Sequence, residues 1–84
     1  MTNITLYTKS TCGFCHRAKQ LLKAKKKNFR EIDILENPDQ RQVMIDRSNG
    51  GLTVPQIFIG DQHIGGCDEL YALERAGKLD ALLS

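Results

Sequence analysis

The sequence Cys12-Gly13-Phe14-Cys15 places two thiols one helical turn apart, at the point where one residue pattern gives way to another. Residues 4–7, before it, alternate apolar and polar side chains in a run typical of a β-strand. Residues 15–25, after it, carry apolar side chains at helical spacing. Two cysteines between a strand and a helix are typical of a redox motif. We therefore expect Cys12 to lie at or just before the N-terminus of the first helix.

The two sulfurs of this motif are predicted to have different roles. Unpaired backbone N–H groups and the positive end of the helix dipole favour a thiolate at a helix N-terminus, and the thiolate is the nucleophilic form of cysteine. Cys12, at the mouth of the helix, is therefore predicted to attack disulfides. Cys15 lies one turn inside the helix with its side chain leaning back towards Cys12. It is predicted to resolve the mixed disulfide that Cys12 forms.

Length and composition indicate one small domain. The 84 residues, of which 40% are hydrophobic, allow a single modest core, so residues 1–84 are expected to form one domain. No run is long or apolar enough to cross a bilayer, and Met1-Thr2-Asn3 leads directly into the first strand. A cytoplasmic protein without a membrane partner is expected. Three cysteines, two of them in one motif, favour catalytic redox chemistry over a secreted disulfide scaffold.

The charge balance argues against a nucleic-acid partner. The formal net charge is only +2, and the single basic cluster falls where the first helix should end. Cations there complement the carbonyl end of the helix dipole. Nucleic-acid modules interleave aromatic residues with basic ones, and Phe29 is the one aromatic residue near this cluster. The cluster consists of Lys23, Lys25, Lys26 and Lys27.

The rest of the chain continues the alternation of strands and helices. A strand over residues 28–34 completes a right-handed parallel crossover. A helix beginning near Pro38 is predicted to bury Val43, Met44 and Ile45 and to end before Gly50. An antiparallel hairpin and two further helices follow. These last elements are predicted over residues 54–59, 62–64, 68–76 and 79–83.

This order of elements is that of an α/β protein with the thioredoxin-like fold, a four-stranded mixed sheet flanked by helices on both faces. Within that fold the chain resembles the glutaredoxins, and among them the short bacterial dithiol type, over essentially its whole length. Single motifs of this kind are weak signals, but here all of them occur in order at glutaredoxin spacing. They are Tyr7-Thr8-Lys9, Thr11-Cys12, Cys15-His16-Arg17-Ala18-Lys19, the segment 53–59 and His63-Ile64-Gly65-Gly66-Cys67-Asp68.

The resemblance implies a glutathione-dependent thiol–disulfide oxidoreductase that reduces protein disulfides and glutathione mixed disulfides. In glutaredoxins the lysine before the motif and a polar residue of the second helix hold the glycine carboxylate of glutathione. The matching positions are Lys9 and Gln42, and Gln42 is equally what a solvated helix face would carry. Phe14 is expected to pack along the thiol of the ligand or to be partly structural.

Two further segments are implied to complete the glutathione site. In Thr53-Val54-Pro55, a cis peptide before Pro55 is expected to leave the Val54 backbone free to pair with the ligand like an added strand.

The second segment is Gly66-Cys67-Asp68, whose main-chain N–H groups suit the γ-glutamyl carboxylate. The Asp68 side chain suits the ligand ammonium, and Asp68 is also a good N-cap in its own right. Cys67 is predicted to be a small buried filler and not a third redox centre.

Other functions stay open at this stage. Gly13-Phe14 is similar to the Cys-Gly-Phe-Ser of monothiol glutaredoxins, which handle iron–sulfur clusters, so a glutathione-ligated [2Fe–2S] cluster bridging two Cys12 residues is the alternative function. Such a cluster would make a dimer of a chain otherwise expected to be monomeric. Against it, Cys15 is not serine and the segment before Cys12 is short. A flavoprotein-fed thioredoxin-type reductase and a structural zinc site are weaker, since zinc would need a second pair of ligands.

Overall fold

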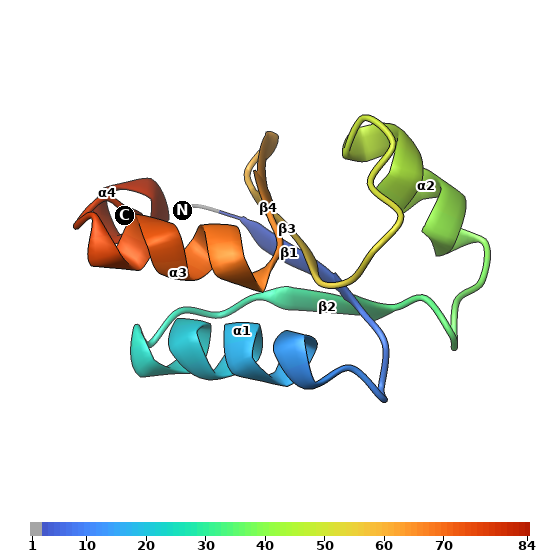
Figure 1. Cartoon of the computed structure of the whole chain (residues 1–84), viewed down its shortest axis with the longest axis horizontal. Helices are drawn as coiled ribbons and strands as arrows, with labels where there is room; N and C mark the ends of the chain where they lie inside the picture. Colours follow the sequence, from blue (N-terminus) through green and yellow to red (C-terminus); the bar gives the residue numbers. More distant parts are fainter. Residues whose placement is uncertain (1–2) are drawn as a thin grey trace.

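The computed structural model describes residues 3–84, which form four strands and four helices around one sheet (Figure 1). The sheet has the order β2-β1-β3-β4. β1 runs parallel to β2 and antiparallel to β3, and β3 and β4 form an antiparallel hairpin. The predicted mixed sheet is confirmed. The elements are β1 (Ile4–Thr8), α1 (Gly13–Ala24), β2 (Arg30–Asp33), α2 (Gln40–Arg47), β3 (Gln56–Ile59), β4 (Gln62–Gly65), α3 (Cys67–Arg75) and α4 (Leu79–Leu83).

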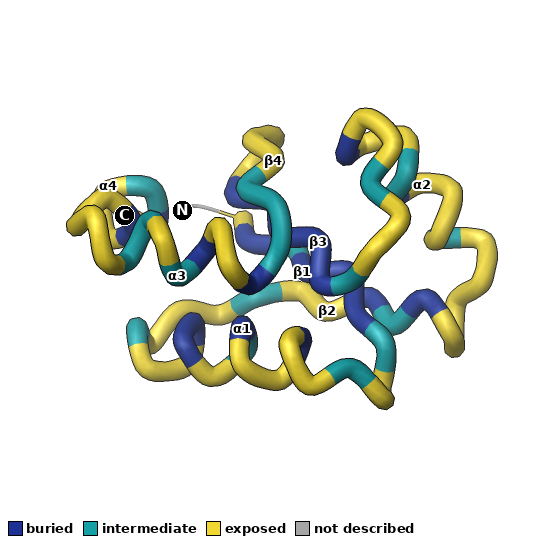
Figure 2. Tube along the Cα trace, viewed as in Figure 1, coloured by how far each residue is buried: buried dark blue, intermediate teal, exposed yellow. Residues whose placement is uncertain are grey.

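Alternate side chains of the two central strands build a core on each face of the sheet. Leu6 of β1 and Ile57 of β3 pack with α1, α3 and α4 on one face. Tyr7 and Phe58, each one residue further on, point to the other face and pack with Met44 of α2. The buried positions follow β1 and β3 and the inner sides of the helices (Figure 2). Helices therefore cover both faces, as the alternation predicts.

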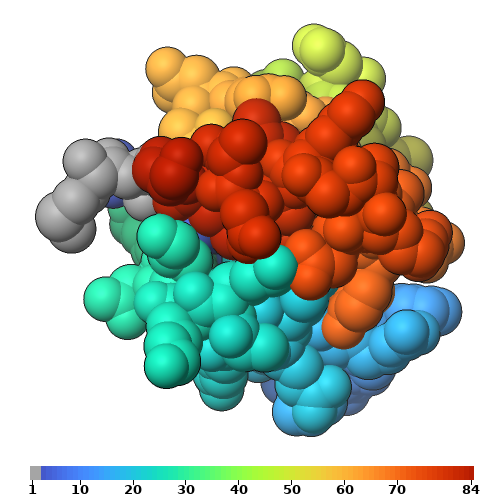
Figure 3. Space-filling model, turned by 90° about the vertical axis from the view of Figure 1, so that its left-hand side faces the viewer, coloured from blue at the N-terminus to red at the C-terminus, as the bar shows by residue number. Residues whose placement is uncertain are grey.

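The C-terminal helices lie against the end of α1 (Figure 3). Lys25, the C-cap of α1, forms ion pairs with Glu74 of α3 at 2.7 Å and with Asp80 of α4 at 2.9 Å. One lysine of the basic cluster is thus a structural ion-pair partner.

Several element boundaries differ from those predicted. β3 begins at Gln56 and not at Val54, because Pro55 has no N–H to donate to a neighbouring strand. The Val54-Pro55 peptide bond is cis. β2 covers only four residues, and α2 begins at Gln40, two residues after Pro38. The expected cis bond is confirmed.

The burial predicted for α2 is partly wrong. Met44 is completely buried and Ile45 half-buried, whereas Val43 is 38% exposed. α2 meets the sheet along a narrow stripe that continues one turn later at the buried Ser48, and Val43 lies to one side of that stripe.

Within residues 3–84, no helix combines the length and apolar character needed to cross a membrane. Met1 and Thr2 lie outside the described residues. The expectation that the N-terminus leads directly into the first strand rests partly on these two residues.

Candidate active site

Cys12 is the N-cap of α1, and its sulfur takes the place of the usual capping oxygen. The Cys15 backbone N–H donates to Cys12 Sγ at 3.1 Å, and the Cys12 backbone is extended with φ −95° and ψ 113°. The chain reaches Cys12 through a tight turn, in which the Cys12 N–H donates to the Lys9 carbonyl at 3.1 Å. Cys12 is half-exposed. A negative charge on this sulfur is therefore stabilised by a backbone N–H and by the helix dipole while the sulfur stays accessible.

Cys15 has the opposite environment. Only 1% of its surface is exposed, and its side chain belongs to the buried face of α1. Burial, and after it the hydrogen bond with Cys12, raises the pKa of the Cys15 thiol to about 12. At neutral pH Cys15 is thus a protonated thiol lying beneath an accessible sulfur.

The Cys12 sulfur also contacts the loop before β3. Its thiol donates to the Val54 carbonyl at a sulfur–oxygen distance of 3.7 Å. The backbone N–H of Val54, in contrast, has no backbone partner within residues 3–84. Both backbone groups of Val54 were expected to be free. The carbonyl accepts the Cys12 thiol, and only the N–H is without a partner among the described residues.

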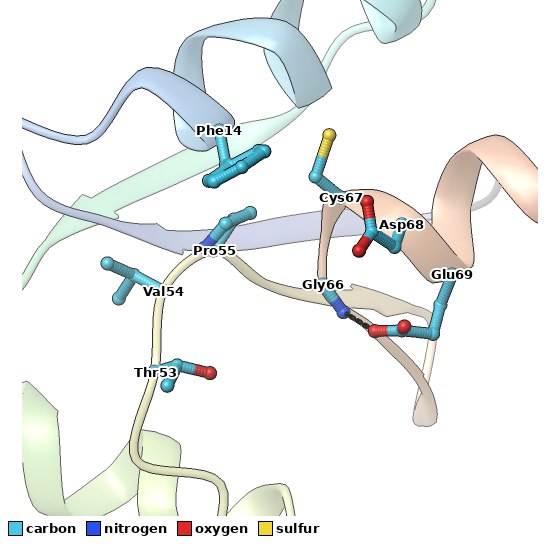
Figure 4. Close-up of a pocket in the computed structure, with 8 residues that line it drawn as sticks. All are labelled: Phe14, Thr53, Val54, Pro55, Gly66, Cys67, Asp68 and Glu69. Atoms are coloured by element: carbon cyan, nitrogen blue, oxygen red, sulfur yellow. Dashed lines mark hydrogen bonds between the residues drawn. The ribbon is translucent and has the colours of Figure 1, made fainter.

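A pocket of about 310 Å³ lies between this loop and the N-termini of α1 and α3 (Figure 4). Phe14, which is 57% exposed, forms the wall on the α1 side, and the buried Pro55 of the loop faces it. The carboxylates of Asp68 and Glu69 come from α3 (Figure 4). The lining is Phe14, Thr53, Val54, Pro55, Gly66, Cys67, Asp68 and Glu69.

The start of α3 differs from the prediction in its cap. The N-cap is Gly66, so Asp68 is the second residue of the helix and the prediction that it caps the helix is wrong. Its carboxylate still lies in the first turn, where it complements the helix dipole. The N–H groups of Cys67 and Asp68 have no acceptor within the helix, because the first turn of any helix lacks one. They are available to an anion in the pocket.

Glu69 lines the pocket but was not predicted from the sequence. Its Oε1 accepts a hydrogen bond from the Gly66 N–H at 2.7 Å, so the Gly66 amide is already occupied. A side chain at Gly65, where φ is +115°, would bring Cβ within 2.7 Å of that oxygen. The signal was present in the sequence: a Glu three residues after the N-cap is the spacing of a capping box.

Cys67 is buried, with 4% of its surface exposed. Burial raises the pKa of its thiol, although Arg17 acts in the opposite direction. The prediction of a small buried side chain is confirmed, with the addition that Cys67 forms part of the pocket wall (Figure 4).

Two predicted binding residues lie outside the lining of the pocket. Lys9 is half-buried in the turn before Cys12. Gln42 is exposed on α2 and donates to Asp46 Oδ1 at 2.9 Å, an intrahelical bond of the kind that a solvated helix face carries. The structure thus brings together Cys12, Phe14 and the segments 53–55 and 66–68, but not Gln42.

The histidine that follows Cys15 and the possible metal ligands do not form a second site. His16 is exposed, and its ring lies 3.2 Å from the Gln20 side-chain nitrogen. In the part of the chain that the structure describes, no group of three or more His, Cys, Asp or Glu residues is arranged to hold a metal ion. The zinc alternative therefore has no set of ligands among these residues.

Comparison with known proteins agrees with this geometry. Residues 4–64 match the model of the glutaredoxin family. Over 83 residues, covering 99% of each chain, the sequence is 58% identical to glutaredoxin 3 of Escherichia coli (strain K12). The solution structure of glutaredoxin from Brucella melitensis is 52% identical with a TM-score of 0.83, covering 99% of this chain and 89% of that one. The crystal structure of a buckwheat glutaredoxin–glutathione complex is 30% identical with a TM-score of 0.88, covering 98% and 76%. On the family match and the full-length identity, this chain belongs to the glutaredoxin family.

Proposed function

We propose that this glutaredoxin reduces glutathione mixed disulfides through Cys12 alone and protein disulfides through Cys12 and Cys15 together. Glutaredoxins are glutathione-dependent thiol oxidoreductases, and membership of the family gives this chain that activity. The observation that carries the division of roles is the Cys15 N–H donating to Cys12 Sγ at 3.1 Å. It favours charge on the accessible sulfur, while the Cys15 thiol beneath it stays protonated.

In the first route, the Cys12 thiolate attacks the glutathione sulfur of a mixed disulfide. The bond between the two substrate sulfurs breaks, the protein thiolate leaves and takes up a proton, and Cys12 is left bonded to glutathione. The thiolate of a second glutathione then attacks the bound glutathione sulfur. This step releases glutathione disulfide and restores the Cys12 thiolate, so Cys15 is not needed.

In the second route, Cys12 attacks a protein disulfide and forms a mixed disulfide with the protein. Cys15 then loses its proton and attacks Cys12 Sγ, which releases the reduced protein and leaves a Cys12–Cys15 disulfide. After burial, the hydrogen bond and charge of Cys12 are causes of the raised pKa of Cys15. Both disappear once Cys12 is in a mixed disulfide, so the first attack makes Cys15 easier to deprotonate. Two glutathione molecules then reduce the disulfide.

The pocket beside Cys12 is proposed to bind the glutathione portion of the substrate. The free N–H groups of Cys67 and Asp68 suit the γ-glutamyl carboxylate, and the Asp68 carboxylate suits the ammonium. Val54 offers its backbone N–H, and Phe14 and Pro55 offer apolar surface. The similar buckwheat protein was crystallised in complex with glutathione, which supports this choice of ligand.

The glycine carboxylate of glutathione is assigned to Lys9. Its ammonium has no ion-pair partner within residues 3–84, and its backbone lies directly beside Cys12. Gln42 would have to release Asp46 to join it, so its share in binding is the weaker part of the proposal.

The alternative function is carriage of a [2Fe–2S] cluster. Cys12 is a half-exposed sulfur that fits one ligand position, but Cys15 and Cys67 are buried. The remaining ligands would have to come from glutathione and a second copy of the chain. Gly13 is exposed, and a Cβ atom added there would meet no atom within 4 Å, which leaves room for such an approach. Among residues 3–84, no contact favours this role over disulfide reduction.

The remaining expectations form part of the proposal. We take residues 1–84 as one domain, active as a monomer in the cytoplasm, with glutathione and disulfide-containing or glutathionylated proteins as partners. Such a compartment keeps thiols reduced, as the mechanism requires of Cys12 and Cys15.

The test is steady-state reduction of a glutathionylated peptide by glutathione, with protein purified without air. Saturable turnover by a colourless protein is expected. Negligible turnover by a brown, dimeric protein would contradict the proposal and make cluster carriage the primary function.

A further inference from the structure

Gln56 is a buried polar residue directly behind the pocket loop. It is the first residue of β3, and only 5% of its surface is exposed. A buried amide is destabilising unless its hydrogen-bonding groups are paired. Here both ends are paired: Nε2 donates to the Thr53 carbonyl at 3.0 Å, and Oε1 lies 2.6 Å from His63 Nε2. The side chain therefore links β4 to the loop that forms one wall of the pocket.

The two partners fix which way the Gln56 amide faces. The Thr53 carbonyl can only accept a hydrogen bond, so the NH₂ group of Gln56 must point to it. The amide oxygen then faces His63, and His63 Nε2 must carry a proton in order to donate. The His63 ring is itself held beside Phe58, with ring centroids 5.0 Å apart. His63 thus selects one orientation of Gln56.

The amide is also held from the side of α2. A Cβ atom at Gly51 would lie 2.8 Å from Gln56 Nε2 and 2.5 Å from Ser48 Oγ, so the glycine backbone packs directly against the amide. The Gly51 N–H donates to Ser48 Oγ at 2.9 Å, and that buried hydroxyl donates to the Met44 carbonyl at 2.7 Å. The Gln56 side chain therefore has little room to move.

The loop itself has few other restraints. Residues 52–55 lie outside the strands, and within residues 3–84 no backbone–backbone hydrogen bond involves them. The peptide between Thr53 and Val54 is trans, so its C=O and N–H point in opposite directions. By holding the Thr53 carbonyl inward, Gln56 directs the Val54 N–H away from the protein interior, at a residue that lines the pocket.

We propose that Gln56 is a positioning residue for the glutathione portion of the substrate. It turns the Thr53–Val54 peptide so that the Val54 N–H can pair with the ligand, and His63 holds Gln56 in the orientation that does so. This inference rests on the proposed function, because it takes Val54 as part of the glutathione site.

The first test is Gln56→Met, which keeps the length and volume of the side chain but removes its hydrogen bonds. The KM for a glutathionylated peptide is expected to rise about three- to tenfold, with kcat changed less than about twofold, because only an oriented binding group is lost. The rate at which iodoacetamide alkylates Cys12 should stay at the parental value. Gln62→Met is the matched control, since Gln62 is exposed on the neighbouring strand, and its KM should equal that of the parent.

The second test uses His63, which is exposed on β4. His63→Leu removes the donor to Gln56 and should raise KM about two- to threefold. His63→Gln supplies an N–H donor again and should return KM to the parental value, a rescue that a role in stability alone would not produce.

Two results would overturn the inference: a parental KM in folded Gln56→Met, or a KM in His63→Leu no higher than in His63→Gln. Absence of glutathione-dependent turnover in the parent would instead contradict the proposed function, so the two failures are distinguishable.

Discussion

Two helices begin at the pocket, and they begin differently. At α1 the capping atom is the sulfur of Cys12, which accepts the N–H of Cys15. At α3 the N-cap is Gly66, which has no side chain, and Glu69 reaches back to its N–H. Both starts provide positive electrostatic potential. At α1 this potential stabilises a charge on the Cys12 sulfur. At α3 the N–H groups of Cys67 and Asp68 remain available to an anion of the ligand.

The difference separates chemistry from recognition. A change at the start of α1 should affect bond making and breaking, and a change at the start of α3 should affect the affinity for glutathione. The variants below test that separation, from the largest expected effect to the smallest.

Cys12→Ser should reduce turnover of every disulfide substrate to the uncatalysed rate, because a hydroxyl is not a nucleophile towards disulfides under these conditions. Serine is itself a favoured N-cap, so the free energy of unfolding should change by less than about 1 kcal/mol. Steady-state assays and urea unfolding measure the two quantities. Retained turnover would refute the assignment of the nucleophile.

Cys15→Ser should separate the two substrate classes. Reduction of protein disulfides should be lost, because no thiol remains to resolve the mixed disulfide. Reduction of a glutathionylated peptide should stay within a few-fold of the parent. The same enzyme preparation, assayed on both substrates, provides its own control. Equal loss on both substrates would show that Cys15 is needed for the first attack.

Lys9→Ala should raise the KM for glutathione about two- to fivefold, the range for a partly exposed ion pair, without a similar change in stability. Lys23→Ala is the matched control, since Lys23 is an exposed lysine at the far end of α1. An unchanged KM in Lys9→Ala would remove Lys9 from the binding site.

Asp68→Asn should raise the KM for glutathione by a similar factor of about two to five, because the amide keeps the shape of the side chain and loses the charge that faces the ammonium. The kcat at saturating glutathione should stay parental. A fall in kcat at constant KM would contradict the separation between the two helix starts.

The smallest effect is expected at Glu31, outside the pocket. Burial opposes ionisation of Glu31, but hydrogen bonds from Lys19 at 3.0 Å and Thr8 at 2.9 Å outweigh it and lower its pKa. The unfolded chain therefore binds a proton more readily, so the stabilisation is present above about pH 4.5 and lost as the pH falls below it. Glu31→Gln should be less stable than the parent at pH 7, by under about 1 kcal/mol, with the gap closing in acid. A gap independent of pH in urea unfolding would contradict this account.

Much of the fold was predictable because its signals are local. Alternation along residues 4–7 predicts the first strand, and the two cysteines mark the start of α1. Val43 was wrongly placed because an eight-residue helix buries only a narrow stripe, and its neighbours in space decide where that stripe runs.

The site was predictable in part for the same reason. Cys12, Val54 and Asp68 belong to short motifs that stay intact in the folded chain. Glu69 was missed although its spacing from Gly66 is that of a capping box. Gln56 was missed because its partner is a backbone carbonyl, a group that every residue carries. Only the folded chain shows that the Thr53 carbonyl is the one within reach of Gln56.

The most direct test of the central claim is to identify the sulfur that carries glutathione. The reduced protein is mixed with one equivalent of a glutathionylated peptide, quenched in acid within the first turnover and mapped by peptide mass spectrometry. The account predicts glutathione on Cys12, with Cys15 and Cys67 unmodified. An adduct on Cys15 or Cys67 would contradict it, because the sulfur at the start of α1 would then not be the one that reacts.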